Sequence, residues 1–284
     1  MQNRPLNWHK GEVKLGTRIA FWGPMKGQIA TTSNVVAAAS LIGTEYTARK
    51  TLLTHTPTNC SLERAFLKKN SVSEQLIKFT DSGLEGLARF ARSGKLSPAI
   101  IRDYTNHIVH QMDILTGTGN LDLKTFNEIL DNCQGYYDLS LIDVDSNIDE
   151  GERRATFEES ELAVVCLNQN AELLDRFFIE KEWEDTLKDI PYIIVLGQYD
   201  KTSHFTYSNI ARKYKIKTPI YSVPRCANYL DAYNQNAVAE FFMRNRNIDR
   251  HDIDFFFFEE VKRLAKGIMS HTGLIGKIKS ERGA

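Results

Sequence analysis

A loop of small residues follows the first apolar run of the chain, Arg18 to Trp22. The loop contains Lys26 and Gly27 and leads into an alanine-rich stretch that begins at Thr32. In an open α/β sheet, the turn from the first strand to the first helix is the usual phosphate site, because free helix N–H groups and the helix dipole face an anion there. The backbone of residues 27–32 is therefore a candidate anion site. The alternative is a tight turn before a capped helix, without any ligand.

A carboxylate ends another buried run. Residues 137–143 read Tyr-Asp-Leu-Ser-Leu-Ile-Asp, so four mostly apolar residues place Asp143 at the end of a strand. A buried strand that ends in aspartate is common, and this pattern alone does not identify a site.

Taken together, these segments resemble motifs of the ParA/MinD superfamily of P-loop ATPases. The deviant Walker A loop of that family reads Lys-Gly-Gly-x-Gly-Lys-[Ser/Thr]-Thr, which places Lys26 on the signature lysine and Thr32 on the magnesium-binding hydroxyl. Asp143 falls on the Walker B aspartate. Val195 to Asp200 resembles the strand before the base-binding loop, and Val223 to Cys226 resembles the loop that closes over adenine.

This resemblance implies ATP and Mg²⁺ as cofactors, with Thr32 and Asp143 near the metal. In the family, the signature lysine reaches across a face-to-face homodimer to the partner's phosphates, which is the expected role of Lys26. A solvated loop lysine is the alternative. The implied nucleotide-binding residues are Lys26, Gly27, Gln28, Ile29, Ala30, Thr31, Thr32, Ser33, Pro224 and Arg225.

The chain also departs from the family pattern. Thr31 stands in place of the phosphate-gripping lysine, and a hydroxyl cannot supply an ammonium group to the phosphates. Replacement of that lysine by a hydroxyl residue resembles the TadZ/CpaE branch of pilus-assembly proteins. The acidic pair that follows the second strand in active relatives is replaced by Thr54 and Thr56, which cannot act as a general base. His55 between them could accept a proton, or it could be an exposed loop side chain.

These features predict an ATP-dependent dimeric switch with weak or no ATP hydrolysis, which positions cellular machinery through a protein partner of a pilus or secretion system. One alternative is a plasmid or chromosome partition ATPase that binds nonspecific DNA. Another is a pseudo-ATPase scaffold that binds no nucleotide. Arg244, Arg246 and Arg250 are candidate DNA contacts, although a solvated charged face is the favoured interpretation.

The composition agrees with a globular protein. The 284 residues include 36 Lys+Arg and 36 Asp+Glu, so their formal charges cancel, which argues against a surface built to coat nucleic acid or anionic lipid. The four cysteines are far apart and are expected to be reduced thiols. No apolar run approaches the roughly 20 residues of a membrane helix, and the polar N-terminus lacks a secretory signal. We therefore expect a cytoplasmic protein.

The elements that must position these residues alternate between short β-rich runs and longer helical runs, as in a parallel sheet with crossover helices. We expect one doubly wound, mainly parallel α/β domain over residues 1–284, with an N-terminal extension (1–17) and a polar C-terminal tail (270–284). The expected strands are Arg18–Trp22, Thr51–Thr54, Asp113–Leu115, Leu139–Val144, Leu162–Leu167, Tyr192–Gly197 and Pro219–Val223. The expected helices are Thr32–Ile42, Ser61–Ser93, Ser97–Gln111, Leu121–Cys133, Asn170–Leu187 and Phe256–Met269.

Four consecutive phenylalanines, Phe255 to Phe258, precede the last predicted helix. Their favoured interpretation is a helix start buried under the sheet, and the alternative is a docking patch for a partner. The tail HTGLIGKIKSERGA contains too few large apolar residues for firm membrane anchoring.

Overall fold

A computed structural model describes residues 16–57, 62–67, 83–117 and 121–275, and in these ranges eight strands form one sheet in the order β3-β4-β2-β5-β1-β6-β7-β8. Neighbouring strands are parallel, except that β3 runs antiparallel to β4. The strands are β1 (Thr17–Trp22), β2 (Thr51–His55), β3 (Asn106–Val109), β4 (Met112–Ile114), β5 (Leu139–Asp143), β6 (Leu162–Leu167), β7 (Tyr192–Tyr199) and β8 (Ile220–Pro224). The predicted fold class is confirmed, with an eighth strand added.

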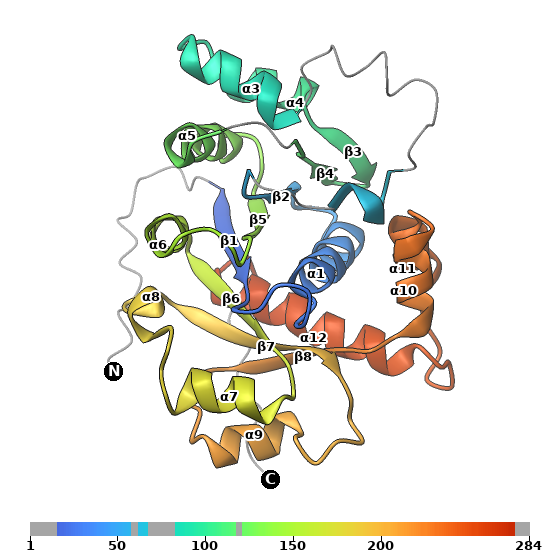
Figure 1. The fold of residues 1–284 in the computed structure, drawn as a ribbon. Coiled ribbons are helices and arrows are strands. Elements are labelled where there is room, and N and C mark those ends of the chain that lie inside the picture. Colours follow the sequence, from blue (N-terminus) through green and yellow to red (C-terminus); the bar gives the residue numbers. More distant parts are fainter. Residues whose placement is uncertain (1–15, 58–61, 68–82, 118–120, 276–284) are drawn as a thin grey trace.

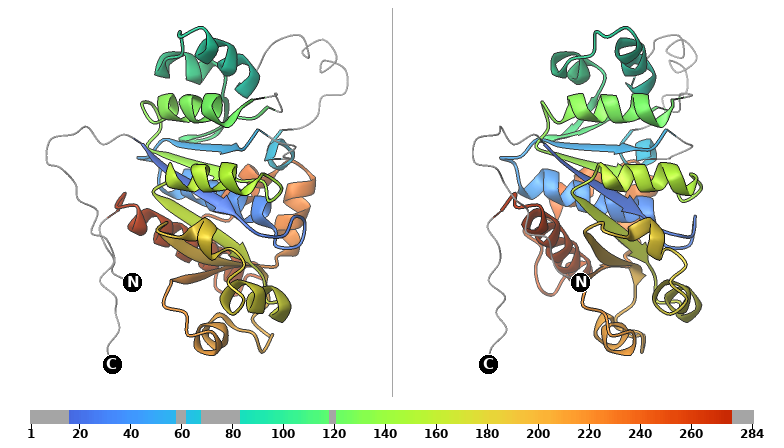
Figure 2. Two further views of the ribbon diagram at one scale, coloured as in Figure 1. Left: turned by 60° about the vertical axis from the view of Figure 1, so that its left-hand side comes forward. Right: turned by 90° about the vertical axis from the view of Figure 1, so that its left-hand side faces the viewer.

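Helices cover both faces of this sheet (Figures 1 and 2). On one face lie α1 and α12, which pack against each other, and α11, which packs on α1; α5 and α6 lie on the other. The helices are α1 (Thr31–Glu45), α3 (Gly83–Arg92), α4 (Pro98–Asp103), α5 (Leu123–Cys133), α6 (Glu150–Glu158), α7 (Ala171–Phe178), α8 (Glu184–Leu187), α9 (Tyr207–Lys213), α10 (Ala227–Asn234), α11 (Val238–Arg244) and α12 (Phe255–His271), with a 3-10 turn, η1, at Leu62–Ala65.

The alanine-rich sequence of α1 is explained by its burial. Every residue from Asn34 to Thr44 is buried, so this helix has no face that is left to solvent along that stretch. Small side chains let it lie close to the sheet, to α11 and to α12 at the same time. Residues 23–30, the candidate phosphate loop, thus lead into a helix that is enclosed from Asn34 to Thr44.

Strand register places Asp143 level with the carboxyl ends of β1 and β2. β5 lies between β1 and β2, and Asp143 is paired with Phe21 of β1 and with His55 of β2. The strand order also reverses around β1, whose neighbours are β5 and β6. In open α/β sheets such a reversal leaves a crevice at the carboxyl ends of the strands, where ligands bind.

The predicted helix Ser97–Gln111 is wrong in its second half. α4 ends at Asp103, and β3 forms a hairpin with β4. The turn of this hairpin contains His110, whose φ of 45° lies in the left-handed region. Pairing with β4 therefore overrides a helix-like spacing of apolar residues.

Two other predicted helices are interrupted. Within Asn170–Leu187, α7 ends at Phe178 and α8 starts at Glu184, because Lys181 has a φ of 56°, which no α-helix accommodates. Within Ser61–Ser93, residues 62–65 form a 3-10 turn and a new helix starts at Gly83, whose φ is 65°. Residues 68–82 lie outside the described part of the chain, as do 1–15 of the predicted extension and 276–284 of the tail.

The phenylalanine run packs into the core. Phe257 and Phe258 are 2% and 0% exposed, and both contact rings of α11. Core packing is therefore confirmed for these two rings, while Phe255 and Phe256 are half-buried. None of the helices in the described ranges is both long and apolar enough to cross a membrane.

Candidate phosphate-loop site

The loop between β1 and α1 ends in a helix start that has no side-chain cap. Ala30 is the N-cap residue, adopts a left-handed conformation (φ 55°, ψ 36°) and offers no side-chain acceptor to the first turn. The first N–H groups of a helix have no acceptor within the helix. An anion at this position would satisfy them and would also be stabilised by the helix dipole.

Close packing fixes the start of the loop. A Cβ atom on Gly23 would lie 2.0 Å from the Ile29 side chain and 2.8 Å from the Cys166 carbonyl oxygen, so only glycine fits. Ile29 is 1% exposed and acts as the hydrophobic anchor of the loop. Gln28 is exposed, and its carbonyl oxygen accepts a hydrogen bond from Asn168.

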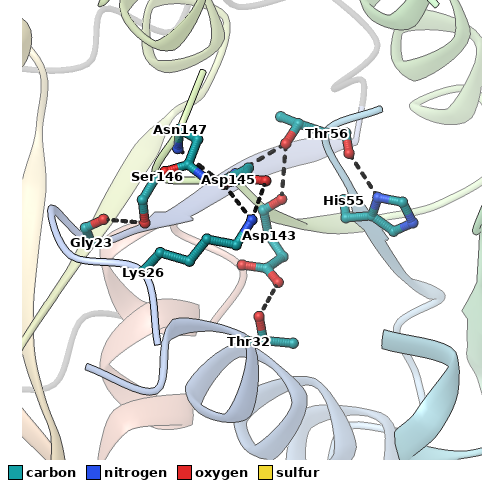
Figure 3. Close-up of polar contacts among 9 residues, drawn as sticks. All are labelled: Gly23, Lys26, Thr32, His55, Thr56, Asp143, Asp145, Ser146 and Asn147. Carbon is teal, nitrogen blue, oxygen red and sulfur yellow. Dashed lines mark hydrogen bonds and ion pairs between the residues drawn. The ribbon is translucent and has the colours of Figure 1, made fainter. Parts of the chain in front are cut away.

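Thr32, in the first turn of α1, faces Asp143 at the end of β5 (Figure 3). The Thr32 hydroxyl donates a hydrogen bond of 2.6 Å to Asp143 Oδ2. Asp143 is 5% exposed, and its carbonyl oxygen accepts the Thr56 N–H at 3.0 Å. A hydroxyl and a carboxylate at this distance are the hard oxygen ligands that Mg²⁺ prefers.

Lys26 reaches back over the same edge to Asp145, two residues beyond Asp143 (Figure 3). Its Nζ atom lies 3.0 Å from Oδ2 and 3.3 Å from Oδ1 of Asp145. The Lys26 side chain is 52% exposed, whereas that of Asp145 is 11% exposed. The Asp145 N–H donates to Thr56 Oγ1 at 3.0 Å, and the next residue, Ser146, donates from its hydroxyl to the Gly23 carbonyl oxygen at 2.6 Å.

These groups line a cleft of about 780 Å³. The predicted residues on its wall are Lys26, Gly27, Ala30, Thr31, Thr32, Ser33, Asp143, Pro224 and Arg225. Gln28 and Ile29 are not on the wall. His55 is not on it either and is 0% exposed, so neither a role at the cleft wall nor an exposed position fits it. Its Nδ1 atom lies 2.7 Å from the Thr56 carbonyl oxygen.

Sequence reasoning missed the part of the wall that α10 supplies. Tyr229, Leu230 and Tyr233 line the cleft, and the Tyr229 hydroxyl donates to the Ser33 carbonyl oxygen at 2.8 Å. Burial raises the pKa of Tyr229 above its ordinary value, so this hydroxyl stays a donor. Only the alternation of aromatic and polar residues in ANYLDAYN could have pointed to this helix, and it resembles any amphipathic helix.

Comparison with known proteins identifies the fold. No protein-family model matches the chain, and no curated protein matches its sequence. A ParA family ATPase from Chlorobium tepidum TLS has a similar structure, with a TM-score of 0.67 and 13% sequence identity over 89% of this chain and 98% of that one. MinD from Pyrococcus horikoshii OT3, complexed with Mg-ADP, has a TM-score of 0.65 and 14% identity over 93% and 100% of the two chains. The chain has the fold of the ParA and MinD ATPases.

A third structure with this fold is a putative plasmid partition protein from Borrelia burgdorferi B31 bound to AMPPNP. Its TM-score is 0.62, with 13% identity over 89% of this chain and 99% of that one. The similarity extends over nearly the full length of each of these chains. It therefore concerns the ParA/MinD architecture as a whole and not a local motif.

The side chains at the cleft fit a nucleotide in part. The uncapped start of α1 suits a phosphate group, and Thr32 with Asp143 would hold Mg²⁺, which neutralises phosphate charge when bound. Lys26 and Arg225 are the lysine and arginine side chains of the described wall. Thr31 adds no charge, so phosphate would be held mainly by backbone N–H groups and the metal.

Proposed function

We propose that this chain is a nucleotide-binding member of the ParA/MinD superfamily, which binds ATP with Mg²⁺ and acts as a dimeric switch in the cytoplasm. Its task would be to position a protein assembly, such as a pilus or secretion system of the TadZ/CpaE kind. The observation that carries this proposal is the Thr32–Asp143 contact of 2.6 Å at the uncapped start of α1. No phosphate chemistry beyond binding is needed for a switch of this type.

Weak or absent hydrolysis is part of the proposal, because the end of β2 carries no carboxylate. The Thr54 hydroxyl donates to the Leu115 carbonyl oxygen at 2.8 Å, and the Thr56 hydroxyl accepts the Asp145 N–H. Both hydroxyl groups are thus used within the fold. His55 is buried beside the Thr56 carbonyl oxygen and does not line the cleft. None of these groups is placed to activate a water molecule as a general base.

The proposed homodimer would use Lys26. Its ammonium group is half-exposed at the mouth of the cleft, where a partner's phosphate could replace Asp145 as its counter-charge. A Lys26→Ala variant should then lose both dimerisation and nucleotide affinity. If Lys26→Ala dimerises and binds nucleotide like the wild type, the cross-dimer role is wrong.

The nucleotide part is tested by titration calorimetry with Mg-ATP, with phosphate release measured in parallel. Removal of a metal-binding hydroxyl or carboxylate by Thr32→Val or Asp143→Asn should weaken binding at least about tenfold. The matched control is Thr202→Val, which removes a hydroxyl from the exposed loop after β7 and should bind like the wild type. If the wild type shows no saturable binding, the nucleotide proposal is wrong and the alternative of a scaffold that binds no nucleotide is favoured.

The partition ATPase remains the second candidate, because a neighbour with the same fold is described as a putative plasmid partition protein. It requires DNA binding together with measurable ATP turnover. Phosphate release that is stimulated by duplex DNA would favour it over the switch. Mg-ATP binding without turnover, with or without DNA, supports the switch.

A further inference from the structure

A second, smaller pocket lies away from the phosphate loop. Its volume is about 280 Å³, and it is formed between the end of α4, the β3–β4 hairpin and the loops that precede β2 and β5. Lys50 directly precedes β2, and the Thr51 N–H donates to the carbonyl oxygen of Gln111 in the hairpin turn. This pocket is therefore at the amino ends of the strands, whereas the phosphate-loop cleft is at their carboxyl ends. The hairpin and α4 lie at the upper edge of the sheet in Figure 1.

The wall of this pocket holds four side chains that can carry a positive charge: Lys50, Arg102, His107 and His110. No ion pair involves Lys50, Arg102 or His110 within the described ranges. Lys50 is held over the Tyr136 ring, with its Nζ atom 3.9 Å from the ring centroid. That contact stabilises the ammonium group without neutralising it.

Asp113 is the one carboxylate among the described residues of the pocket wall, and both of its oxygens have partners. Its Oδ1 atom lies 2.9 Å from Nδ1 of His107, and its Oδ2 atom accepts the Tyr137 hydroxyl at 2.7 Å. Tyr137 is 2% exposed and is also hydrogen-bonded to Thr105 at 3.1 Å. Both carboxylate oxygens of Asp113 thus already have hydrogen-bond partners within the wall.

Asp138, two residues after Tyr136 of the pocket wall, is occupied as well. Asp138 accepts the Lys50 N–H at 2.9 Å through Oδ2, and its Oδ1 atom lies 3.4 Å from the Arg49 side chain. Both contacts hold the loop that presents Lys50, and neither uses the Lys50 ammonium group. The pocket therefore has an excess of cationic groups around a small, polar space, and a multivalent anion is the ligand that such a space selects.

We infer that this pocket is a second binding site, which takes a phosphate group as a free ion or as the phosphomonoester of a small molecule. Arg102 and Lys50 would supply charge-assisted hydrogen bonds, while the hairpin histidines His107 and His110 complete the donor set. The site is separate from the proposed nucleotide cleft, because none of the residues that the structure describes lines both pockets. Its occupancy would fix the β3–β4 hairpin against α4.

The histidine rings provide a readout that belongs to this pocket alone. Ring signals are recorded by proton–nitrogen NMR while inorganic phosphate, or a sugar phosphate, is added at constant ionic strength set by sodium chloride. His107→Gln and His110→Gln assign the two signals among the seven histidines of the chain. We expect saturable shifts of His107 and His110 while the signal of buried His55 stays unchanged. The titration that saturates at the lower concentration, with inorganic phosphate or with the sugar phosphate, identifies the preferred ligand.

The variants Lys50→Gln and Arg102→Gln should each raise the Kd by about tenfold, because each removes a charge-assisted contact. Lys95→Gln is the matched control, since it removes an exposed lysine that lines neither pocket. The inference is overturned if sodium chloride alone reproduces the shifts, or if both pocket variants keep the wild-type curve. Loss of nucleotide binding at the cleft would leave these histidine shifts in place, so the two proposals fail separately.

Discussion

Gly197 of β7 lies so close to the loop before α1 that this position has no room for a side chain. A Cβ atom at this position would lie 2.5 Å from the Ile29 carbonyl oxygen and 2.7 Å from Nδ2 of Asn34. Asn34 is 1% exposed and donates to the same Ile29 oxygen at 3.2 Å. The side-chain amide of Asn34 thus occupies the space that a side chain at position 197 would need. Its hydrogen bond to Ile29 holds the loop against the sheet.

Gly197→Ala should therefore destabilise the fold by about 1–3 kcal/mol, because backbone atoms must move to admit the methyl group. Urea unfolding followed by circular dichroism measures the change. Gly151→Ala is the control: it lies in the first turn of α6, where alanine is the better helix former and the nearest atom is the tip of Asp149. Equal stability of the two variants would contradict the packing described for Gly197.

Cys226, at the rim of the cleft, should be an unreactive thiol. Its pKa is raised to about 12, mainly by burial and also by the carboxylate of Asp254. Because the thiolate is the reactive form, alkylation at pH 8 should be at least about 100-fold slower than for a free cysteine, with a rate that rises up to about pH 12. Iodoacetamide labelling of a Cys60→Ser background measures this, since Cys133 and Cys166 are fully buried. Asp254→Asn should accelerate the reaction, and a rate that levels off near pH 8.5 would refute the assignment.

At the scale of elements, the β3–β4 hairpin depends on one buried hydroxyl. Tyr137 connects the start of β5 to β4 through Asp113 and to the α4–β3 turn through Thr105. Tyr137→Phe removes these bonds and leaves a carboxylate oxygen without its donor, which should cost about 1–3 kcal/mol. Tyr136→Phe is the matched control, because no hydrogen bond of the Tyr136 hydroxyl is found among the described residues. The denaturant midpoint of Tyr137→Phe should therefore be lower than that of Tyr136→Phe. Equal midpoints would contradict the role of the Tyr137 hydroxyl.

The central strands could be predicted from the sequence because each is a short, mainly apolar segment, and each is buried at every residue. β6, Leu162–Leu167, has the predicted bounds and is buried at every residue. β3 could not be predicted in this way. Its first two residues are exposed, and its partner β4 contributes only three residues, so long-range pairing and not local pattern decides its conformation.

The residues of the site likewise differ in whether sequence motifs or long-range packing determine their positions. Thr32 and Asp143 were predicted from the resemblance to the Walker A and Walker B motifs, and they meet because β1 and β5 are neighbouring strands. The contributions of Tyr229 and Tyr233 depend on where α10 packs, and this is set by contacts with α11 and η1 that no local spacing encodes. The Lys26–Asp145 pair likewise depends on the conformation of two loops.

At the scale of the whole molecule, the 36 basic and 36 acidic residues give no net charge that would attract DNA, which agrees with the proposed protein partner. Arg244, Arg246 and Arg250 are all exposed near the end of α11, but the overall charge offers no long-range attraction to DNA. Fluorescence anisotropy with a labelled duplex should give no saturable binding at about 0.15 M salt. Binding that strengthens at low salt and is abolished by Arg244→Glu with Arg246→Glu would instead favour the partition ATPase.

The enclosure of α1 by α12 can be completed only late in synthesis. α1 leaves the ribosome well before α12, which ends at His271, and the Arg49 side chain beside the start of β2 donates to the Leu274 carbonyl oxygen at 3.2 Å. Until α12 has been synthesised, the face of α1 that it covers stays exposed to solvent. The full enclosure of the helix that follows the cleft loop therefore depends on a segment that is translated much later than the loop itself.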